Sequence, residues 1–143
     1  MAQFNKISNF KSGFSLIELL ITLAIISVLA AIIYPSYNFY IVKIRRSNVS
    51  AIMLEVATRL EQYYVKNNKY DGATLSNLAV DDSSYKDYYQ INISAQTNSY
   101  FLQATPIGAQ AKSDQQCKVL GLDQNGNKTI TGESDVEYCW GAG

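Results

Sequence analysis

A long, almost entirely apolar segment, residues 14–34, limits the fold of this chain more than any other feature. The segment holds 21 residues, and Glu18 is its only charged side chain. Because an α-helix rises about 1.5 Å per residue, a helix of this length spans about 30 Å, the thickness of the hydrocarbon core of a bilayer. The sequence therefore predicts a membrane-spanning helix close to the start of the chain.

A short basic segment, residues 1–13, precedes the apolar run and carries two lysines and no acidic residue. A secretory signal is cleaved beyond its apolar region, whereas the candidate site here, between Gly13 and Phe14, lies before it. Cleavage there would remove the basic segment and leave the apolar helix on the mature chain. An uncleaved membrane helix is the alternative, but it leaves Glu18 unexplained, because a carboxylate inside a membrane usually has a partner.

The residues around this site, Gly13-Phe14-Ser15-Leu16-Ile17-Glu18, resemble the processing site of the type IV prepilin family. The resemblance implies that a dedicated prepilin peptidase cuts after Gly13 and that the new N-terminus, Phe14, is N-methylated. It also implies that Glu18 attracts the N-terminal amine of a neighbouring subunit during assembly. The implied location is the inner membrane of a bacterium, expected to be Gram-negative, and then an extracellular pilus. The implied partners are other pilin subunits in a helical filament, the inner-membrane assembly machinery, and membrane lipid before assembly.

Helical periodicity continues beyond the apolar segment, and no glycine or proline interrupts residues 36–70. The apolar residues that recur mostly three or four positions apart are Ile41, Val49, Ile52, Val56, Leu60 and Tyr63. This pattern predicts an amphipathic helix with one apolar stripe, ending near Asn67. Pro35 lacks an amide donor and clashes with the carbonyl group four residues back, so we expect a kink there. Type IV pilins often have a proline at the matching position.

Beyond the helix, alternating apolar and polar residues predict β-strands. The residues expected on one buried face are Tyr89, Ile91 and Ile93, followed after a short turn by Tyr100, Leu102 and Ala104. Residues 119–122 and 128–130 predict a third and a fourth strand, joined by a turn. The expected fold class is α+β, in which the amphipathic half of a long N-terminal helix packs on an antiparallel sheet of three or four strands.

The expected division of the chain has three parts. Residues 1–13 are the leader, residues 14–35 are the transmembrane and assembly helix, and residues 36–143 are a pilin-like globular head.

Two cysteines, Cys117 and Cys139, lie near the C-terminus with 21 residues between them. In an exported protein such a pair is expected to form a disulfide, and type IV pilins carry a C-terminal region bounded by one. One alternative is two free thiols in a reducing compartment. Another is a metal site, which two cysteines without histidine do not complete.

The composition gives no support to an enzyme. The chain contains no histidine, and it has neither a nucleophile motif nor a phosphate-binding loop, so no cofactor is predicted. Lys plus Arg and Asp plus Glu are both 12, so there is no overall positive field to attract nucleic acid. Lys112, Lys118 and Lys128 are nevertheless candidate DNA contacts, because some minor pilins bind DNA. A solvated surface is the simpler interpretation of these lysines.

One turn resembles a metal loop. Asp123, Asn125 and Asn127 have the spacing of the first ligands of a calcium loop. However, glycine stands at the fourth place, and Ser134 occupies the position where a calcium loop has glutamate. A hairpin turn is therefore the preferred interpretation, with calcium binding as the alternative.

Residues at the end of the long helix resemble one group within the type IV pilin family, the minor pilins. Its asparagines and tyrosines resemble those of minor pilins of the PilE-like kind: Tyr63, Tyr64, Asn67, Asn68 and Tyr70. We therefore expect a minor pilin that takes part in pilus assembly, twitching motility, adhesion or DNA uptake. A major pilin and a type II secretion pseudopilin are alternatives within the family. A DNA-binding receptor displayed on the pilus is the alternative of another class.

Overall fold

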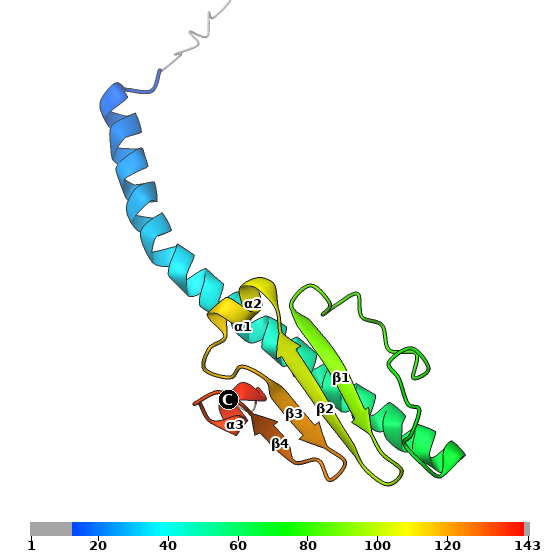
Figure 1. Cartoon of the computed structure of the whole chain (residues 1–143). Helices are drawn as coiled ribbons and strands as arrows, with labels where there is room; N and C mark the ends of the chain where they lie inside the picture. The colour runs from blue at the N-terminus through cyan, green and yellow to red at the C-terminus, as the bar shows by residue number, and fades with distance from the viewer. Residues whose placement is uncertain (1–12, 142–143) are drawn as a thin grey trace, which may run out of the picture. The chain divides into compact units, whose positions relative to one another are not determined.

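A computed structural model describes residues 13–141, apart from the side chains of residues 35 and 36 (Figure 1). The expected leader therefore lies outside the described residues except for Gly13. The chain divides into two compact units, one ending at Tyr37 and the other, the head, beginning at Asn38. In chain order the elements are α1 (Leu16–Asn67), β1 (Tyr89–Ala95), β2 (Tyr100–Pro106), α2 (Gly108–Ser113), β3 (Leu120–Asp123), β4 (Lys128–Ile130) and α3 (Val136–Cys139).

Helix α1 joins the apolar segment and the amphipathic segment in one run of 52 residues. Its end is fixed by Asn68, which adopts the left-handed conformation with φ 54° and donates its backbone N–H to the Tyr64 carbonyl at 2.7 Å. Asparagine tolerates this conformation better than most residues, so it ends helices well. The predicted end near Asn67 is confirmed. The helix continues through residue 35, and the kink at Pro35 stays a prediction.

Four antiparallel strands form one sheet in the order β1-β2-β3-β4, which confirms the predicted α+β class. The expected turn between the first two strands is present, with the Gln96 N–H donating to the Ser99 carbonyl. Pro106 is the last residue of β2. Strand β3 begins at Leu120, one residue later than expected, because the Val119 N–H donates to the Thr131 hydroxyl instead.

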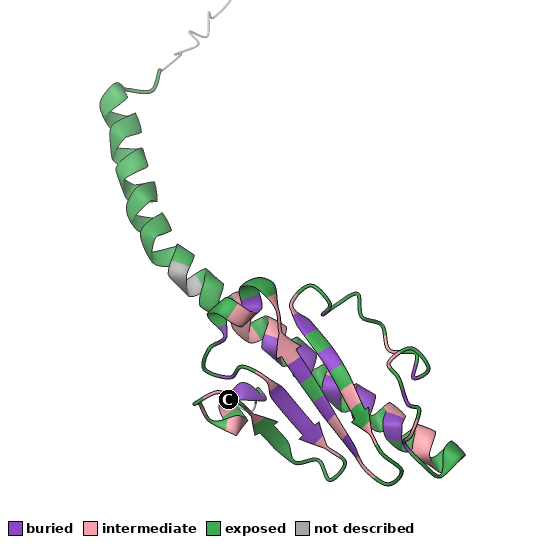
Figure 2. Ribbon diagram, viewed as in Figure 1, coloured by how far each residue is buried: buried purple, intermediate pink, exposed green. Residues whose placement is uncertain are grey.

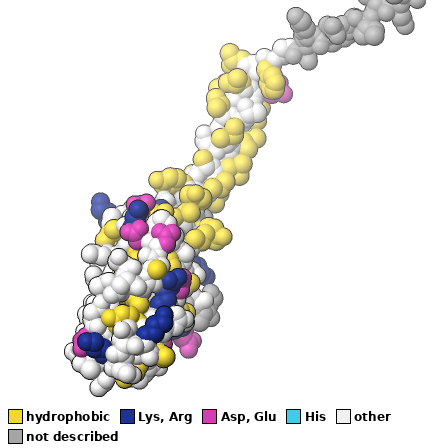
Figure 3. Space-filling view, turned by 90° about the vertical axis from the view of Figure 1, so that its right-hand side faces the viewer, with side chains coloured by type: hydrophobic (Ala, Val, Ile, Leu, Met, Phe, Trp, Pro, Cys, Tyr) yellow, Lys and Arg dark blue, Asp and Glu magenta, His cyan; other side chains and the backbone are white. Residues whose placement is uncertain are grey.

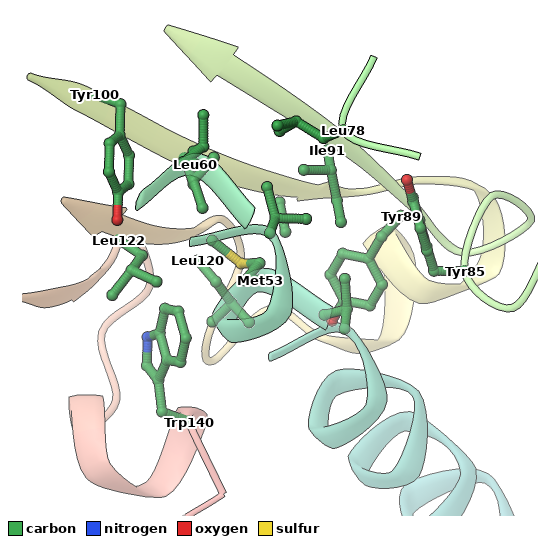
Figure 4. Close-up of a cluster of buried hydrophobic side chains, with 14 of the residues drawn as sticks. Met53, Leu60, Leu78, Tyr85, Tyr89, Ile91, Tyr100, Leu120, Leu122 and Trp140 are labelled. Atoms are coloured by element: carbon green, nitrogen blue, oxygen red, sulfur yellow. The ribbon is translucent and has the colours of Figure 1, made fainter. Parts of the chain in front are cut away.

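The core lies between one face of the sheet and the head half of α1 (Figures 1 and 2). Its central side chains are Val49, Met53, Val56 and Leu60 from the helix and Tyr89, Ile91, Tyr100, Leu102, Ala104, Leu120 and Leu122 from the sheet. Figure 4 shows Met53 and Leu60 beside Leu120 and Leu122, with Trp140 packed below them. Each buried Val, Leu, Ile or Met side chain of this set stabilises the fold by about 1.5–3 kcal/mol when it leaves water.

The connection between α1 and β1, residues 68–88, has no regular period in the sequence and is built from turns in the structure. Side chains hold it in place. Arg59 on α1 donates to the backbone carbonyls of Leu78 and Ala79 at 2.7 and 3.0 Å. Leu78 and Tyr85 in turn insert into the core beside Ile91 (Figure 4).

Candidate functional site

The first half of α1 exposes apolar side chains on every side. From Leu16 to Tyr34 the large apolar residues are between 52 % and 78 % exposed. The mean hydropathy reaches 2.8 over an 18-residue window of α1. We call residues 16–34 the stem, and Figure 3 shows hydrophobic side chains along it. A surface helix of a globular protein hides one face only, whereas a helix that is apolar all round belongs in a membrane or inside an assembly. By length and composition, this segment is able to cross a bilayer.

The expected processing site lies just before this helix. Phe14 is 80 % exposed, and a side chain added at Gly13 would meet no atom within 4 Å. No described residue therefore covers the peptide bond between Gly13 and Phe14, at which a protease would act. Glu18 is the acidic residue of the first helical turn, where the positive end of the helix dipole favours a carboxylate.

The head half of α1 packs the predicted apolar stripe against the core, and it also carries exposed apolar side chains on its opposite side. The buried stripe contains Val49, Met53, Val56 and Leu60, and the sequence reading had left Met53 out. Ile41, Ile52 and Tyr63, expected in the stripe, are only half-buried. The second stripe follows helical spacing on the opposite side and is exposed, with Tyr40, Ile44, Ala51, Leu54 and Val65. The helix therefore keeps an apolar face that the head does not cover.

A buried polar cluster joins α1, β1 and α2, and the sequence analysis did not find it. Arg46 forms an ion pair with Asp114 at 2.6 Å, and both side chains are almost fully buried. The Tyr89 hydroxyl donates to the other oxygen of Asp114, and the Gln110 amide donates to Asp114, to Tyr89 and to the Val42 carbonyl. Burial and the nearby Asp114 carboxylate raise the pKa of Tyr89. Because Arg46 and Asp114 are 68 positions apart, no local pattern indicates the pair.

Tyrosines pack around Glu61 near the end of α1. The Tyr70 hydroxyl donates to both Glu61 oxygens, at 3.0 and 3.1 Å. Tyr70 also lies against Tyr64 and Tyr100, with ring centroids 4.6 and 5.0 Å apart. Burial, with the Glu61 carboxylate as a second cause, raises the pKa of Tyr70 to about 12. The tyrosines that the sequence connected with the helix end thus fasten that end to the sheet.

The two cysteines form the expected disulfide. Cys117 and Cys139 are bonded and fully buried, with their Cα atoms 5.6 Å apart. The bond ties α3 to the segment before β3. Next to it, the Trp140 indole donates to the Thr129 carbonyl at 3.2 Å, and the ammonium of Lys128 lies 5.3 Å from the centre of the indole ring.

The three candidate DNA-contacting lysines are exposed but are spread over the head. Lys112 lies on α2. Lys128 begins β4 opposite Leu122, at the turn end of the β3–β4 pair. Lys118 lies at the other end of that pair, next to the point where the Gly132 N–H donates to the Cys117 carbonyl. The three lysines thus come from three different parts of the head.

The calcium-like segment forms a hairpin turn. One oxygen of Asp123 accepts the backbone N–H groups of Asn125 and Asn127, and the other accepts the Asn127 side-chain amide. These hydrogen bonds hold the pKa of Asp123 below its usual range. Both carboxylate oxygens are therefore engaged within the turn. Over residues 13–141, no group of three or more metal-binding side chains lies together.

Known protein families match both halves of this architecture. A family described as "Type IV minor pilin ComP, DNA uptake sequence receptor" matches residues 35–121, and the prokaryotic N-terminal methylation motif matches residues 8–34. The major component PilA4 of the wide type IV pilus of Thermus thermophilus is 34 % identical over 98 residues, which are 67 % of this chain and 74 % of that protein. The major fimbrial protein FimA of Dichelobacter nodosus is 43 % identical over 77 residues, but this chain spans only 46 % of its length.

Solved structures share the fold. The Neisseria meningitidis non-core minor pilin PilV superposes with a TM-score of 0.52 at 19 % identity, over 68 % of this chain and 94 % of that one. A type IV pilin from Shewanella oneidensis superposes with a TM-score of 0.50 at 21 % identity, over 66 % and 96 %. The apolar stem and the antiparallel sheet are those of a pilin. The methylation motif and a family match over more than half of the sequence point to the same family. This chain therefore belongs to the type IV pilin family, in the group that the minor-pilin family describes.

Proposed function

We propose that this chain is a minor subunit of a type IV pilus. In this proposal a peptidase removes residues 1–13, α1 anchors the mature chain in the inner membrane, and the assembly machinery then transfers it into a filament at the cell surface. Its role is structural, in starting or maintaining the filament, and contributes to twitching motility, adhesion or DNA uptake. The chain needs no cofactor for this role.

One observation carries the proposal: α1 exposes apolar surface along both of its halves. The stem is apolar all round, and the head half keeps an exposed stripe with Ile44 and Leu54 opposite the core. In the bilayer, lipid covers the stem. In a filament, the helices of neighbouring subunits would cover both surfaces, which removes apolar area from water and favours assembly.

Glu18 supplies the test of assembly. Cleavage after Gly13 creates an amine at Phe14, about one helical turn away along the chain. In apolar surroundings a carboxylate and an ammonium from adjacent subunits attract each other strongly, and each relieves the desolvation of the other. Glu18→Ala should therefore leave processing, membrane insertion and the head unchanged, while incorporation into filaments falls.

Processing and incorporation are measured separately. Mass spectrometry of the membrane extract should show a chain that starts at methylated Phe14, and immunoblots of sheared filaments report incorporation. Normal incorporation of the processed alanine variant would remove the assembly role of Glu18. A mature chain that still begins at Met1, in a host with the peptidase, would contradict the proposal itself.

The abundance of the subunit separates a minor pilin from the alternatives. A minor pilin should form a small fraction of the protein in sheared filaments, and a major pilin should dominate it. A type II secretion pseudopilin should be missing from surface filaments, and its deletion should block secretion of exported enzymes.

DNA binding is the second candidate function, favoured by the description of the matching family as a DNA uptake sequence receptor. The net charge of the head does not favour DNA binding, because acidic residues slightly outnumber basic ones. Of the 12 basic residues, Lys6 and Lys11 precede the stem, which leaves 10, and of the 12 acidic residues Glu18 lies in the stem, which leaves 11. Binding would therefore depend on local lysines, with Lys112, Lys118 and Lys128 as candidates.

Salt dependence tests this candidate. Anisotropy of a labelled duplex should show affinity that falls steeply with salt if the lysines contact phosphates. Replacing one contacting lysine with Gln should lower the slope of log affinity against log salt by about one. Lys66→Gln, at the end of α1, removes the same charge away from the candidates and serves as the control. Equal effects of all four substitutions would argue against a defined DNA site.

A further inference from the structure

Strand β1 forms one edge of the sheet, because its only partner strand in the order β1-β2-β3-β4 is β2. In an antiparallel pair, the residues of a strand direct their backbone N–H and C=O groups alternately towards the partner and away from it. At one end of the pair, the Ile107 N–H donates to the Tyr88 carbonyl. At the other end, the Gln96 N–H donates to the Ser99 carbonyl. The even-numbered residues of β1 therefore face β2, and the odd-numbered residues face outward.

The connection between α1 and β1 closes the outer side of this edge only at its two ends. The Tyr89 N–H donates to the Tyr85 carbonyl, and the Thr97 carbonyl accepts the Tyr70 N–H. The outward residues between these two hydrogen bonds are Ile91, Ile93 and Ala95. Over residues 13–141, no hydrogen bond from outside the sheet reaches their backbone groups. This edge therefore offers N–H donors and carbonyl acceptors in the alternating pattern that another extended backbone matches.

The sequence of β1 does not protect its edge. Edge strands of native proteins usually avoid pairing with another chain by being short or by carrying charged residues or proline. Strand β1 has seven residues and contains neither a charged residue nor a proline. The opposite edge differs, since β4 has only three residues and begins with Lys128. Of the two edges of the sheet, β1 is therefore the one suited to pairing.

An open groove with a volume of about 620 Å³ lies between the first part of β1 and the connection. Ile91 of β1 forms part of its wall. The apolar and aromatic side chains that line it from other segments are Leu75, Val80, Tyr85 and Ile107. Asp82 and Lys86 are the charged residues of the lining, and they form an ion pair at 3.8 Å. Because these two charges cancel, the groove favours uncharged, apolar side chains over anions or cations.

We propose that the outer edge of β1 binds an extended segment of another protein, which adds a fifth strand to the sheet. An antiparallel segment pairs its backbone with Ile91, Ile93 and Ala95. Side chains of directly opposite residues lie on the same face of a sheet, so its residues opposite these three point to the core side, where Ile91 lines the groove. The segment therefore has apolar residues at these positions and polar residues between them, beside the exposed Asn92. The site is separate from the exposed stripe of α1 and goes beyond the proposed structural role.

The test uses the full chain, isotopically labelled, in neutral detergent micelles. The probe is the uncharged peptide acetyl-Val-Thr-Val-Thr-Val-amide, and NMR follows the backbone amides of β1. The amides of Ile91, Ile93 and Ala95 should show saturable shifts, because their N–H groups gain an acceptor, and the amides already bonded to β2 should move less. The same peptide with an N-methyl group on its central valine loses one hydrogen bond and places a methyl group against the edge. It should bind about ten-fold more weakly.

Two adjacent substitutions test the protein side. Ala95→Pro removes an outward N–H and keeps the hydrogen bonds to β2, since an edge strand accepts proline where the N–H faces away from its neighbour. It should weaken binding of the probe about five-fold. Ser94→Ala is the control, because the Ser94 N–H faces β2 and its side chain is exposed, and it should leave binding unchanged.

Three results would overturn the proposal. The first is the absence of a saturable shift at millimolar concentrations of the probe. The second is equal binding of the N-methylated peptide, or equal effects of the two substitutions, because binding would then not use the backbone of the edge. The third is self-association of the chain through the same amides, measured by sedimentation, which would make this edge an interface between two copies. Each of these results leaves the proposed pilus role intact, because filament incorporation is measured separately.

Discussion

At the scale of single residues, Gly132 shows how closely the disulfide region packs. A Cβ atom at this position would overlap the backbone carbonyl of Gln116 and lie 2.8 Å from the carbonyl carbon of Cys117. Since the obstacle is backbone, no side chain can rotate away. The approach also aligns the Gly132 N–H with the Cys117 carbonyl, so one glycine allows both the contact and its hydrogen bond.

Gly132→Ala should therefore destabilise the head. The backbone must shift to accept the methyl group, and overpacking of this kind costs about 1–3 kcal/mol. Chemical denaturation of the full chain in detergent would measure the loss. Glu133→Ala, at the exposed neighbouring position, is the control and should change stability by less than about 0.5 kcal/mol. Equal stability of the two variants would contradict the tight approach.

Tyr70 makes the stability of the head sensitive to alkali. Its pKa is raised to about 12, so the folded state keeps the phenol protonated where the unfolded chain, with a pKa near 10, releases the proton. The contribution of Tyr70 is complete below pH 10 and is lost as the pH rises through 12. Tyr70→Phe should lower stability by about 1 kcal/mol at neutral pH and flatten its fall between pH 10 and 12.

Denaturation curves at several pH values measure this prediction. Tyr100, whose pKa is also raised by burial and Glu61, remains in the variant, so the fall should become shallower without vanishing. Tyr40→Phe removes a hydroxyl from an exposed ring and is the control. An unchanged alkaline slope in the Tyr70 variant would contradict the coupling to Glu61.

At the scale of elements, the disulfide stabilises the C-terminal part of the head. Helix α3 has four residues and β4 has three, and elements this short are not stable alone. The bond links α3 to the segment before β3, and Trp140 adds its hydrogen bond to β4. The region therefore keeps its shape through cross-links and packing more than through regular secondary structure.

Replacing both Cys117 and Cys139 by Ala should cost about 3 kcal/mol of unfolding free energy, by the chain-entropy estimate for a loop of this length. Amide exchange should quicken first in α3 and β4, with α1, β1 and β2 protected. Because both sulfur atoms are buried, a reductant should act on the native wild-type protein only slowly. Rapid alkylation of the two cysteines without denaturant would contradict this arrangement.

Sequence reasoning found the elements whose signal is local. The 3.6-residue period gave α1 and its end near Asn67, and the alternation of Tyr89, Ile91 and Ile93 gave β1 with its inner face. The short helices α2 and α3 were missed, because four to six residues do not establish a period. The exposed stripe of α1 was missed for another reason. A periodic pattern identifies apolar residues in the sequence, but it does not show which of them the head buries. Only the folded structure shows that Met53 is buried and Leu54 is exposed.

The processing motif is likewise local, so the candidate site at Gly13, Phe14 and Glu18 could be proposed from sequence. The buried polar cluster could not be proposed in this way, because the ion pair of Arg46 with Asp114 exists only after the chain has folded.

At the scale of the whole molecule, α1 presents one stripe to the core of the head and leaves another exposed. Met53 and Leu54 are neighbours in the sequence, yet one side chain is fully buried in the core and the other is 46 % exposed on the opposite side. In the proposed pilus subunit, the first stripe would serve folding and the second would serve contact between subunits.

This adjacent pair allows a matched experiment. Leu54→Lys should leave unfolding free energy within about 0.5 kcal/mol of the wild type and should lower incorporation into filaments, because a charge then faces the neighbouring subunit. Met53→Ala should lose about 2–5 kcal/mol of stability through a cavity in the core. Urea denaturation and immunoblots of sheared filaments measure the two effects. Normal incorporation of Leu54→Lys would show that the exposed stripe plays no part in assembly.

The strand order β1-β2-β3-β4 bears on how the chain leaves the cell interior. A chain held by its N-terminal helix is threaded across the membrane from that end, so its strands arrive outside one after another. Each strand after β1 pairs with the strand that precedes it in the chain, so that partner is already in place when it arrives. In the proposed pilus subunit, Cys139 would cross the membrane after all four strands, so its bond to Cys117 would form on a sheet whose strands are already outside. The order of crossing would then match the order of strand pairing.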